Sequence, residues 1–89
     1  MKIVIDADIP FIKGVFEQYC QVLYRKGGDF TKELVKDADA LIVRTRTKCN
    51  ALLLENTSVK LVATATIGTD HIDMDFCSSS NIKVVNAAG

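Results

Sequence analysis

The sequence predicts an α/β domain built on a parallel β-sheet. Short runs rich in β-branched residues recur along the chain, and segments with helical character separate them. The clearest runs, residues 2–6 and 40–45, place apolar residues at consecutive positions, as strands buried on both faces do. Alternating strands and helices imply parallel strands joined by right-handed crossovers. At 89 residues the chain has room for one domain.

The first half of the chain contains three predicted strands. The first covers residues 2–6, and Pro10 then stands where a first helical turn tolerates proline. Apolar residues at helical spacing predict a helix over residues 10–19. These residues are Phe11, Ile12, Val15, Phe16 and Tyr19. A second strand over residues 20–24 ends at the turn signal Gly27-Gly28. Asp29 or Thr31 then caps a short helix that runs to Lys36, before the third strand at residues 40–45.

The second half repeats the alternation. Asn50 is suited to cap a helix over residues 51–55, and a fourth strand follows at residues 60–66. Asp73 is suited to cap a helix that ends at Ser79, and a fifth strand covers residues 82–87. Five strands of this kind predict the flavodoxin-like order 2-1-3-4-5. The sequence stops just after the fifth strand, so we expect one sheet face to be uncovered and the chain to be part of a longer protein.

Composition and charge exclude several classes of protein. Lys plus Arg and Asp plus Glu number 11 each, so no overall positive charge attracts nucleic acid or an acidic membrane. No apolar run approaches the roughly eighteen residues of a membrane-spanning helix. The three cysteines, Cys20, Cys49 and Cys77, form no CxxC pair, which predicts small apolar core residues in a reduced, cytoplasmic compartment.

The segment "RTRTK" follows the third strand, at the edge where ligands bind in open parallel sheets. If this segment stays extended, Arg44, Arg46 and Lys48 project to one side, and Thr45 and Thr47 to the other. Such a row of cations is suited to grip a phosphate or a carboxylate. A solvated basic loop is the alternative interpretation.

The segment "ATIGTDH" follows the fourth strand and ends at the same edge. Gly68 permits a turn with positive φ, whose N–H groups form an anion-binding nest, and Thr66 and Thr69 add hydroxyl donors. The alternative is an ordinary strand-to-helix loop that needs a glycine. The spacing of Asp70, His71 and Asp73 matches no metal-ligand pattern, and no second group is placed to orient His71 as a catalytic base.

Other binding functions lack their motifs. Neither GxGxxG nor GxxxxGK[ST] occurs, so the sequence predicts no dinucleotide or P-loop site. Asp6 and Asp8 resemble the acidic pair of a receiver module, but Arg44 and Thr45 stand where a receiver needs its phosphate-accepting aspartate. A stand-alone binding domain, with a partner on its uncovered sheet face, also remains an alternative.

These motifs carry a resemblance to a known family. The order "ALIVRTRT", "KLVATATIGTDHID" and "IKVVNAAG" resembles the substrate domain of the NAD-dependent D-isomer-specific 2-hydroxyacid dehydrogenases. Carried over to this sequence, the resemblance implies that Thr45 and Thr66 contact a small phosphorylated hydroxyacid. It also implies that Arg44 lines the same rim, together with Ile67 and Gly68 through their backbone.

The resemblance has consequences for the whole protein. It implies that residues 1–89 are the N-terminal part of the substrate-binding domain. The NAD-binding Rossmann domain, with the catalytic arginine, glutamate and histidine, is then absent from this chain, so we expect no catalytic, cofactor-binding or metal-binding residue here. His71 does not correspond to the catalytic histidine. The full-length protein is expected to be a cytoplasmic homodimer, and this chain alone is expected to be inactive.

Overall fold

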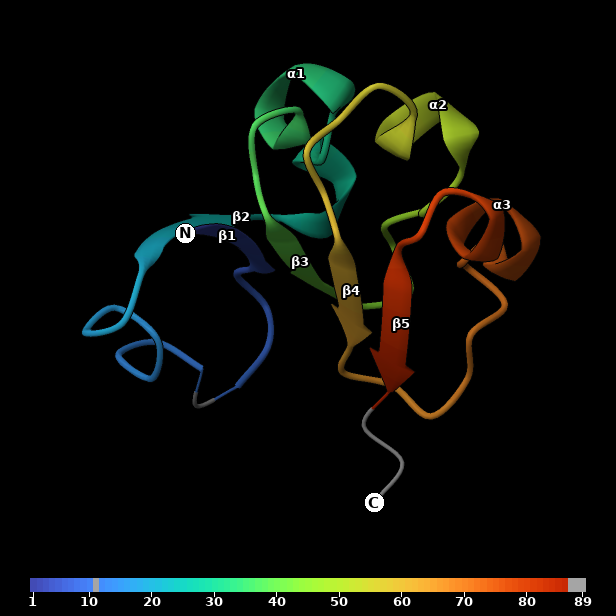
Figure 1. Cartoon of the computed structure of the whole chain (residues 1–89). Coiled ribbons are helices and arrows are strands. Elements are labelled where there is room, and N and C mark those ends of the chain that lie inside the picture. The colour runs from blue at the N-terminus through green and yellow to red at the C-terminus, as the bar shows by residue number, and fades with distance from the viewer. Residues whose placement is uncertain (11, 87–89) are drawn as a thin grey trace.

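The structure, a computed structural model, describes residues 1–10 and 12–86. Its centre is a parallel sheet of five strands in the order β2-β1-β3-β4-β5 (Figure 1), which confirms the predicted flavodoxin-like order. The strands are β1 (Lys2–Asp6), β2 (Gln21–Arg25), β3 (Ala40–Val43), β4 (Leu61–Thr64) and β5 (Lys83–Asn86).

Three short α-helices connect the later strands, and each begins where the sequence predicts a cap. The helices are α1 (Lys32–Val35), α2 (Ala51–Leu54) and α3 (Met74–Ser79), with the 3-10 turn η1 (Gly27–Asp29) ahead of α1. The side chains of Thr31, Asn50 and Asp73 each accept a hydrogen bond from the backbone N–H three residues further on. These caps satisfy N–H groups that have no partner inside a helix.

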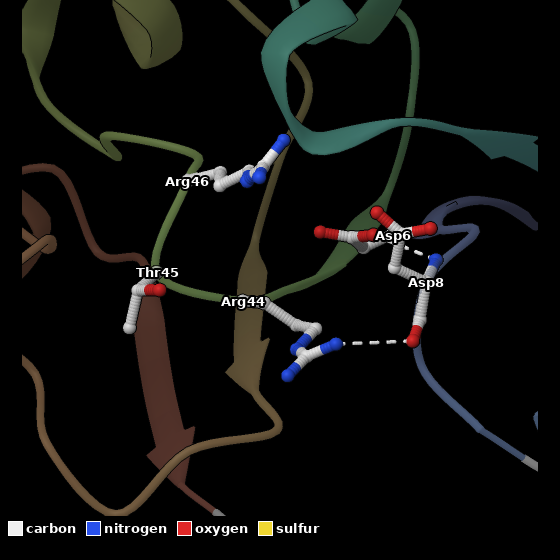
Figure 2. Close-up of a pocket in the computed structure, with 5 residues that line it drawn as sticks. All are labelled: Asp6, Asp8, Arg44, Thr45 and Arg46. Carbon is white, nitrogen blue, oxygen red and sulfur yellow. Dashed lines mark hydrogen bonds between the residues drawn. The ribbon is translucent and has the colours of Figure 1, made fainter.

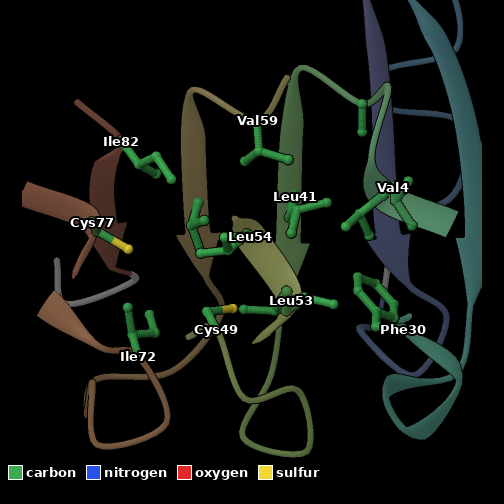
Figure 3. Packing of buried hydrophobic residues seen from close by; sticks show 14 residues of the cluster. Val4, Phe30, Leu41, Cys49, Leu53, Leu54, Val59, Ile72, Cys77 and Ile82 are labelled. Atoms are coloured by element: carbon green, nitrogen blue, oxygen red, sulfur yellow. The ribbon is translucent and has the colours of Figure 1, made fainter. Parts of the chain in front are cut away.

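The three α-helices pack on one face of the sheet. Leu23, Val4, Leu41, Val62 and Val84 occupy paired positions on neighbouring strands, so they form one row across that face. The side chains of α1, α2 and α3 complete the same hydrophobic cluster (Figure 3). The main core therefore lies between the row and the helices.

The other face is covered unevenly. Its row of paired residues is Ile5, Ile42, Ala63 and Val85. Ile5 is fully buried beneath residues 7–10 and 12–20, whereas Val85 on β5 is 39% exposed. Figure 1 shows these residues beside β1 and β2, well away from β5. The expectation of an incompletely covered sheet face therefore holds for its β5 side.

The predicted helix over residues 10–19 is wrong. The described residues of this segment form consecutive turns, with isolated bonds such as Tyr19 N–H to the Phe16 carbonyl at 2.9 Å. Gly14 has a φ of 89°, which no right-handed helix accepts. Phe11, assigned to this helix from its spacing, lies outside the described residues.

The strands are shorter than predicted, or shifted by one residue. β2 begins at Gln21 and extends to Arg25, and β5 begins at Lys83 instead of residue 82. Ala87, predicted as the last residue of the fifth strand, lies outside the described range. β3 ends at Val43 and β4 at Thr64, each two residues early. The segments that follow β3 and β4 therefore begin as loops at Arg44 and Ala65.

The two rows predict different responses to truncation. Leu41→Ala should lower the free energy of unfolding by about 2–5 kcal/mol, because Leu41 is fully buried and its removal leaves a cavity. Val85→Ala is the matched control on the exposed end of the opposite row, and its loss should stay within about 0.5 kcal/mol. Urea unfolding measures both. Equal losses would contradict the asymmetry of the two faces.

Candidate anion-binding site at the carboxyl edge of the sheet

Two loops lie side by side along the carboxyl edge of the sheet: the β3 loop (residues 44–49) and the β4 loop (residues 65–73). At their start the strands pair Val43 with Thr64, and the N–H of Ala65 donates to the Val43 carbonyl at 2.8 Å. At their far end Cys49 pairs with Ile72 in an isolated parallel bridge. In this bridge the N–H of Cys49 donates to the His71 carbonyl at 2.8 Å. The two loops are therefore joined to each other at both ends.

The β3 loop forms a polar pocket of about 230 Å³ with the end of β1 (Figure 2). Its lining residues are Asp6, Asp8, Arg44, Thr45 and Arg46. The Arg44 guanidinium donates to the backbone carbonyl of Asp8 at 3.1 Å. Among the described residues, neither arginine forms a salt bridge. The pocket therefore holds two guanidinium groups and two carboxylates that form no ion pair with one another.

The β3 loop turns instead of continuing the strand. The N–H of Thr47 donates to the Arg44 carbonyl at 3.3 Å, so residues 44–47 form a turn, and the extended alternation considered from the sequence is wrong. The buried hydroxyl of Thr47 donates to the Gly27 carbonyl at 3.1 Å. Thr47 therefore anchors the loop to η1, and it is unavailable to a ligand.

Gly27 packs closely against two residues of the pocket wall, Arg46 and Asp6. A Cβ at this position would lie 2.9 Å from both the Cβ of Arg46 and a carboxylate oxygen of Asp6. That separation is shorter than side chains tolerate, so only glycine fits without moving the pocket wall. The sequence indicated a turn at Gly27-Gly28, but it carried no signal of this contact.

The β4 loop is organised by hydroxyl and imidazole hydrogen bonds. Thr64 Oγ1 lies 2.9 Å from His71 Nε2 and 2.7 Å from Thr66 Oγ1, and the Thr66 hydroxyl donates to the Gly68 carbonyl at 2.9 Å. Asn86 at the end of β5 donates its side-chain amide to the Ile67 carbonyl at 3.1 Å. The loop conformation is therefore fixed by its own polar side chains and by the neighbouring strand.

Gly68 does not have the positive φ expected from the sequence. Of the described glycines, only Gly14 lies in that region, so Gly68 does not build a nest of that geometry. No atom lies within 4 Å of a Cβ placed at Gly68, which leaves open space over the loop. The N–H groups of Ile67 and Gly68 have no acceptor among the described residues. Both residues are exposed, so these two N–H groups belong to the solvent-exposed part of the loop.

The structure divides the predicted site residues between the two loops. Arg44 and Thr45 line the pocket beside Asp6 and Asp8, whereas Thr66, Ile67 and Gly68 lie in the adjoining β4 loop and outside the pocket lining. Sequence reasoning missed the buried contacts that hold these loops, because their partners are distant in the chain.

Burial controls the titration of the groups near the site. Burial lowers the pKa of His71; nearby Asp70 opposes this shift and Lys48 adds to it. Burial raises the pKa of the Cys49 thiol to about 12, with a further contribution from Cys77. His71 is therefore neutral at pH 7, and Cys49 is a protonated apolar core residue. In the parts of the chain that the structure describes, no cluster of His, Cys, Asp or Glu is suited to a metal ion, and no helix is long and apolar enough to cross a membrane.

Comparison with known proteins places the chain in a family. The sequence-family model of the D-isomer specific 2-hydroxyacid dehydrogenase catalytic domain matches residues 3–89. The chain belongs to this family. Its parallel sheet is therefore the sheet of a dehydrogenase catalytic domain, as the resemblance in "VRTRT" and "TATIGTDHID" implied.

Two similar relatives within the dehydrogenase family have the same name. The chain is 56% identical to the erythronate-4-phosphate dehydrogenase of Bacteroides thetaiotaomicron and 47% identical to that of Shewanella halifaxensis. Both matches cover the whole of this chain but only 26% and 24% of the relatives. The chain thus spans about a quarter of the length of these relatives.

Solved structures of the family have the same fold. The NAD⁺-bound 3-phosphoglycerate dehydrogenase of Entamoeba histolytica superposes with a TM-score of 0.77 at 28% identity, over 97% of this chain and 32% of that chain. The pyruvate reductase of Chlamydomonas reinhardtii superposes with a TM-score of 0.82 at 17% identity, over 100% of this chain and 29% of that chain. The second likeness supports the fold alone.

The described residues do not fit a dinucleotide. In many α/β sheets the turn after the first strand offers free N–H groups and a helix N-terminus to the pyrophosphate. Here the described residues that follow β1 form turns and begin no helix, so they offer no helix N-terminus to a pyrophosphate.

The close approach of Gly27 to Arg46 and Asp6 gives a prediction that Gly28 controls. Gly27→Ala should lower the free energy of unfolding by about 1–3 kcal/mol, because its methyl group overlaps Arg46 and Asp6. Gly28→Ala should be neutral, or stabilising by up to about 1 kcal/mol, because nothing lies within 4 Å of its Cβ. Urea unfolding of both variants measures the difference. Equal effects would contradict the close approach at Gly27.

Proposed function

We propose that residues 1–89 are the N-terminal part of the substrate domain of an NAD-dependent erythronate-4-phosphate dehydrogenase. The full enzyme would oxidise 4-phospho-D-erythronate at its 2-hydroxyl to 2-oxo-3-hydroxy-4-phosphobutanoate, in pyridoxal 5′-phosphate biosynthesis. The observation that carries the proposal is the adjacency of the β3 loop and the β4 loop on a chain that is 56% identical to such an enzyme.

The donors on the two loops match the chemistry of this substrate. 4-Phospho-D-erythronate carries a carboxylate at one end and a phosphate at the other. Arg44 and Arg46 form one set of donors, and the N–H groups of Ile67 and Gly68 form a second set. Two separate sets suit a ligand with an anionic group at each end better than one set, because each charged end then has its own partners. The hydroxyls of Thr45 and Thr66 stand beside these sets and add neutral donors.

Binding and orientation are the proposed tasks of this part of the enzyme. Oxidation of the 2-hydroxyl requires an acceptor for hydride and a base for the proton. Among the described residues His71 is buried and hydrogen-bonded through Nε2, so it is not such a base. We therefore assign NAD binding and proton removal to a Rossmann domain and catalytic residues outside residues 1–89. The whole enzyme is proposed to be a cytoplasmic homodimer.

A second candidate is D-3-phosphoglycerate dehydrogenase, or another D-2-hydroxyacid dehydrogenase. The structural likeness to the Entamoeba histolytica enzyme favours it, since that chain is 28% identical over nearly all of this one. Both acids carry a carboxylate and a phosphate, so the two loops suit either. Initial rates of the full-length enzyme with each acid distinguish them: erythronate phosphate should be the better substrate by kcat/KM.

Arg44 provides the direct test of the site. In the full-length enzyme, Arg44→Ala should raise KM about 10- to 150-fold, because one charge-assisted hydrogen bond contributes about 1.5–3 kcal/mol. Lys60→Ala is the matched control, because it removes an equal charge at the opposite edge of the sheet, just before β4. Steady-state kinetics measure both. An unchanged KM in Arg44→Ala would remove the pocket from the proposed site.

The domain assignment gives a second prediction. Calorimetric titration of residues 1–89 with NAD should show no binding, and the same chain should have no dehydrogenase activity. The full-length enzyme is the positive control in the same buffer. Tight NAD binding to residues 1–89 would contradict the assignment of the cofactor to another domain.

A further inference from the structure

We infer that His71 is a positioning residue for the substrate site, which acts through Thr64 to orient the Thr66 hydroxyl as a hydrogen-bond donor at the rim. The inference rests on the proposed function, in which Thr66 contacts the substrate. It assigns a role to a histidine that is neither a catalytic base nor a metal ligand.

The direction of the hydrogen bonds follows from counting hydrogens. A carbonyl only accepts, so Thr66 uses its single hydroxyl hydrogen on the Gly68 carbonyl. The 2.7 Å contact between the two threonines then needs the hydroxyl hydrogen of Thr64. Thr64 has no second hydrogen, so its 2.9 Å contact with His71 needs a hydrogen on Nε2. The structure therefore assigns the Nε2–H form to His71.

This chain of donors runs from the core to the rim. His71 and Thr64 are buried, at 9% and 2% exposure, whereas Thr66 is half-buried and Gly68 exposed. The hydrogen bond from the Cys49 N–H to the His71 carbonyl fixes the backbone of His71 against the β3 loop. The charged groups that face His71 are Asp70 on its own loop and Lys48 on the β3 loop. Protonation of Nδ1 leaves the Nε2–H in place, so the direction does not depend on charge.

The direction matters for an anionic ligand. Since Thr66 accepts from Thr64, its own hydrogen is committed to the outer side, where the Gly68 carbonyl now takes it. An oxygen of a carboxylate or phosphate can replace that carbonyl as the acceptor. Without a donor at position 71, Thr64 loses its inner hydrogen bond, and its hydroxyl is free to rotate away from Thr66. The Thr66 hydroxyl then loses the hydrogen bond that it accepts, and with it the polarisation that strengthens its own donation to an anion.

The test is a double-mutant cycle in the full-length enzyme with 4-phospho-D-erythronate. His71→Phe should raise KM about 2- to 10-fold, the range of one neutral hydrogen bond, with little change in kcat. His71→Gln should recover most of the loss, because its amide N–H donates in a similar place. In a Thr66→Ala background, His71→Phe should have no further effect on KM. Val59→Ala, a buried truncation at the opposite edge of the sheet, controls for lost stability.

Each outcome decides the inference. If the double variant raised KM by the product of the two single effects, the inference would be overturned. A KM for His71→Gln as high as that for His71→Phe would also overturn it. A normal KM in Thr66→Ala with a raised KM in Arg44→Ala would overturn it and leave the proposed function standing. If His71→Phe fails to fold, ¹⁵N NMR of the imidazole in the wild-type enzyme decides: a proton on Nε2 supports the chain, and the Nδ1–H tautomer overturns it. That measurement needs no substrate, so it is independent of the proposed function.

Discussion

The parallel pairing of β3 with β4 is the constraint on which the site depends. Because parallel strands end at the same edge, the pairing of Val43 with Thr64 brings together two loops that are about twenty residues apart in sequence. The bridge between Cys49 and Ile72 closes the far end of both loops. Neither loop is held mainly by ion pairs. Their geometry follows from backbone pairing and from hydrogen bonds of uncharged side chains such as Thr47 and Thr66, and not from mobile charged side chains.

The core explains why this pairing is stable. Leu41 and Val62 are fully buried beneath the helices and lie in register on the two paired strands, so sliding one strand past the other would expose apolar surface. The capped helix α2 follows the β3 loop, and α3 follows the β4 loop. Each loop is thus fixed by a strand before it and a helix after it. Such a scaffold can expose Arg44 and two free N–H groups without losing their relative placement.

Much of this architecture is encoded locally and could be predicted. The order of strands followed from buried apolar runs, and the caps at Asn50 and Asp73 from residue type and position. The carboxyl edge followed from the general rule for open parallel sheets, which is why Arg44 and Thr66 were placed at one rim. These predictions need only neighbouring residues or a rule of topology.

The failures have a common cause in distant contacts and backbone conformation. The helical spacing of residues 10–19 was overridden at Gly14, whose φ of 89° interrupts any helix. The turn in the β3 loop depends on Thr47 and Gly27, which are 20 residues apart. The role proposed for His71 requires the strand end at Thr64, which no local pattern reveals.

A crystal structure of the full-length enzyme with 4-phospho-D-erythronate tests the central claim most directly, namely that the two loops form one site. The account predicts that one charged end of the ligand contacts Arg44 and that the other accepts from the N–H groups of Ile67 and Gly68. A ligand bound to only one loop, or away from the carboxyl edge of this sheet, would contradict it.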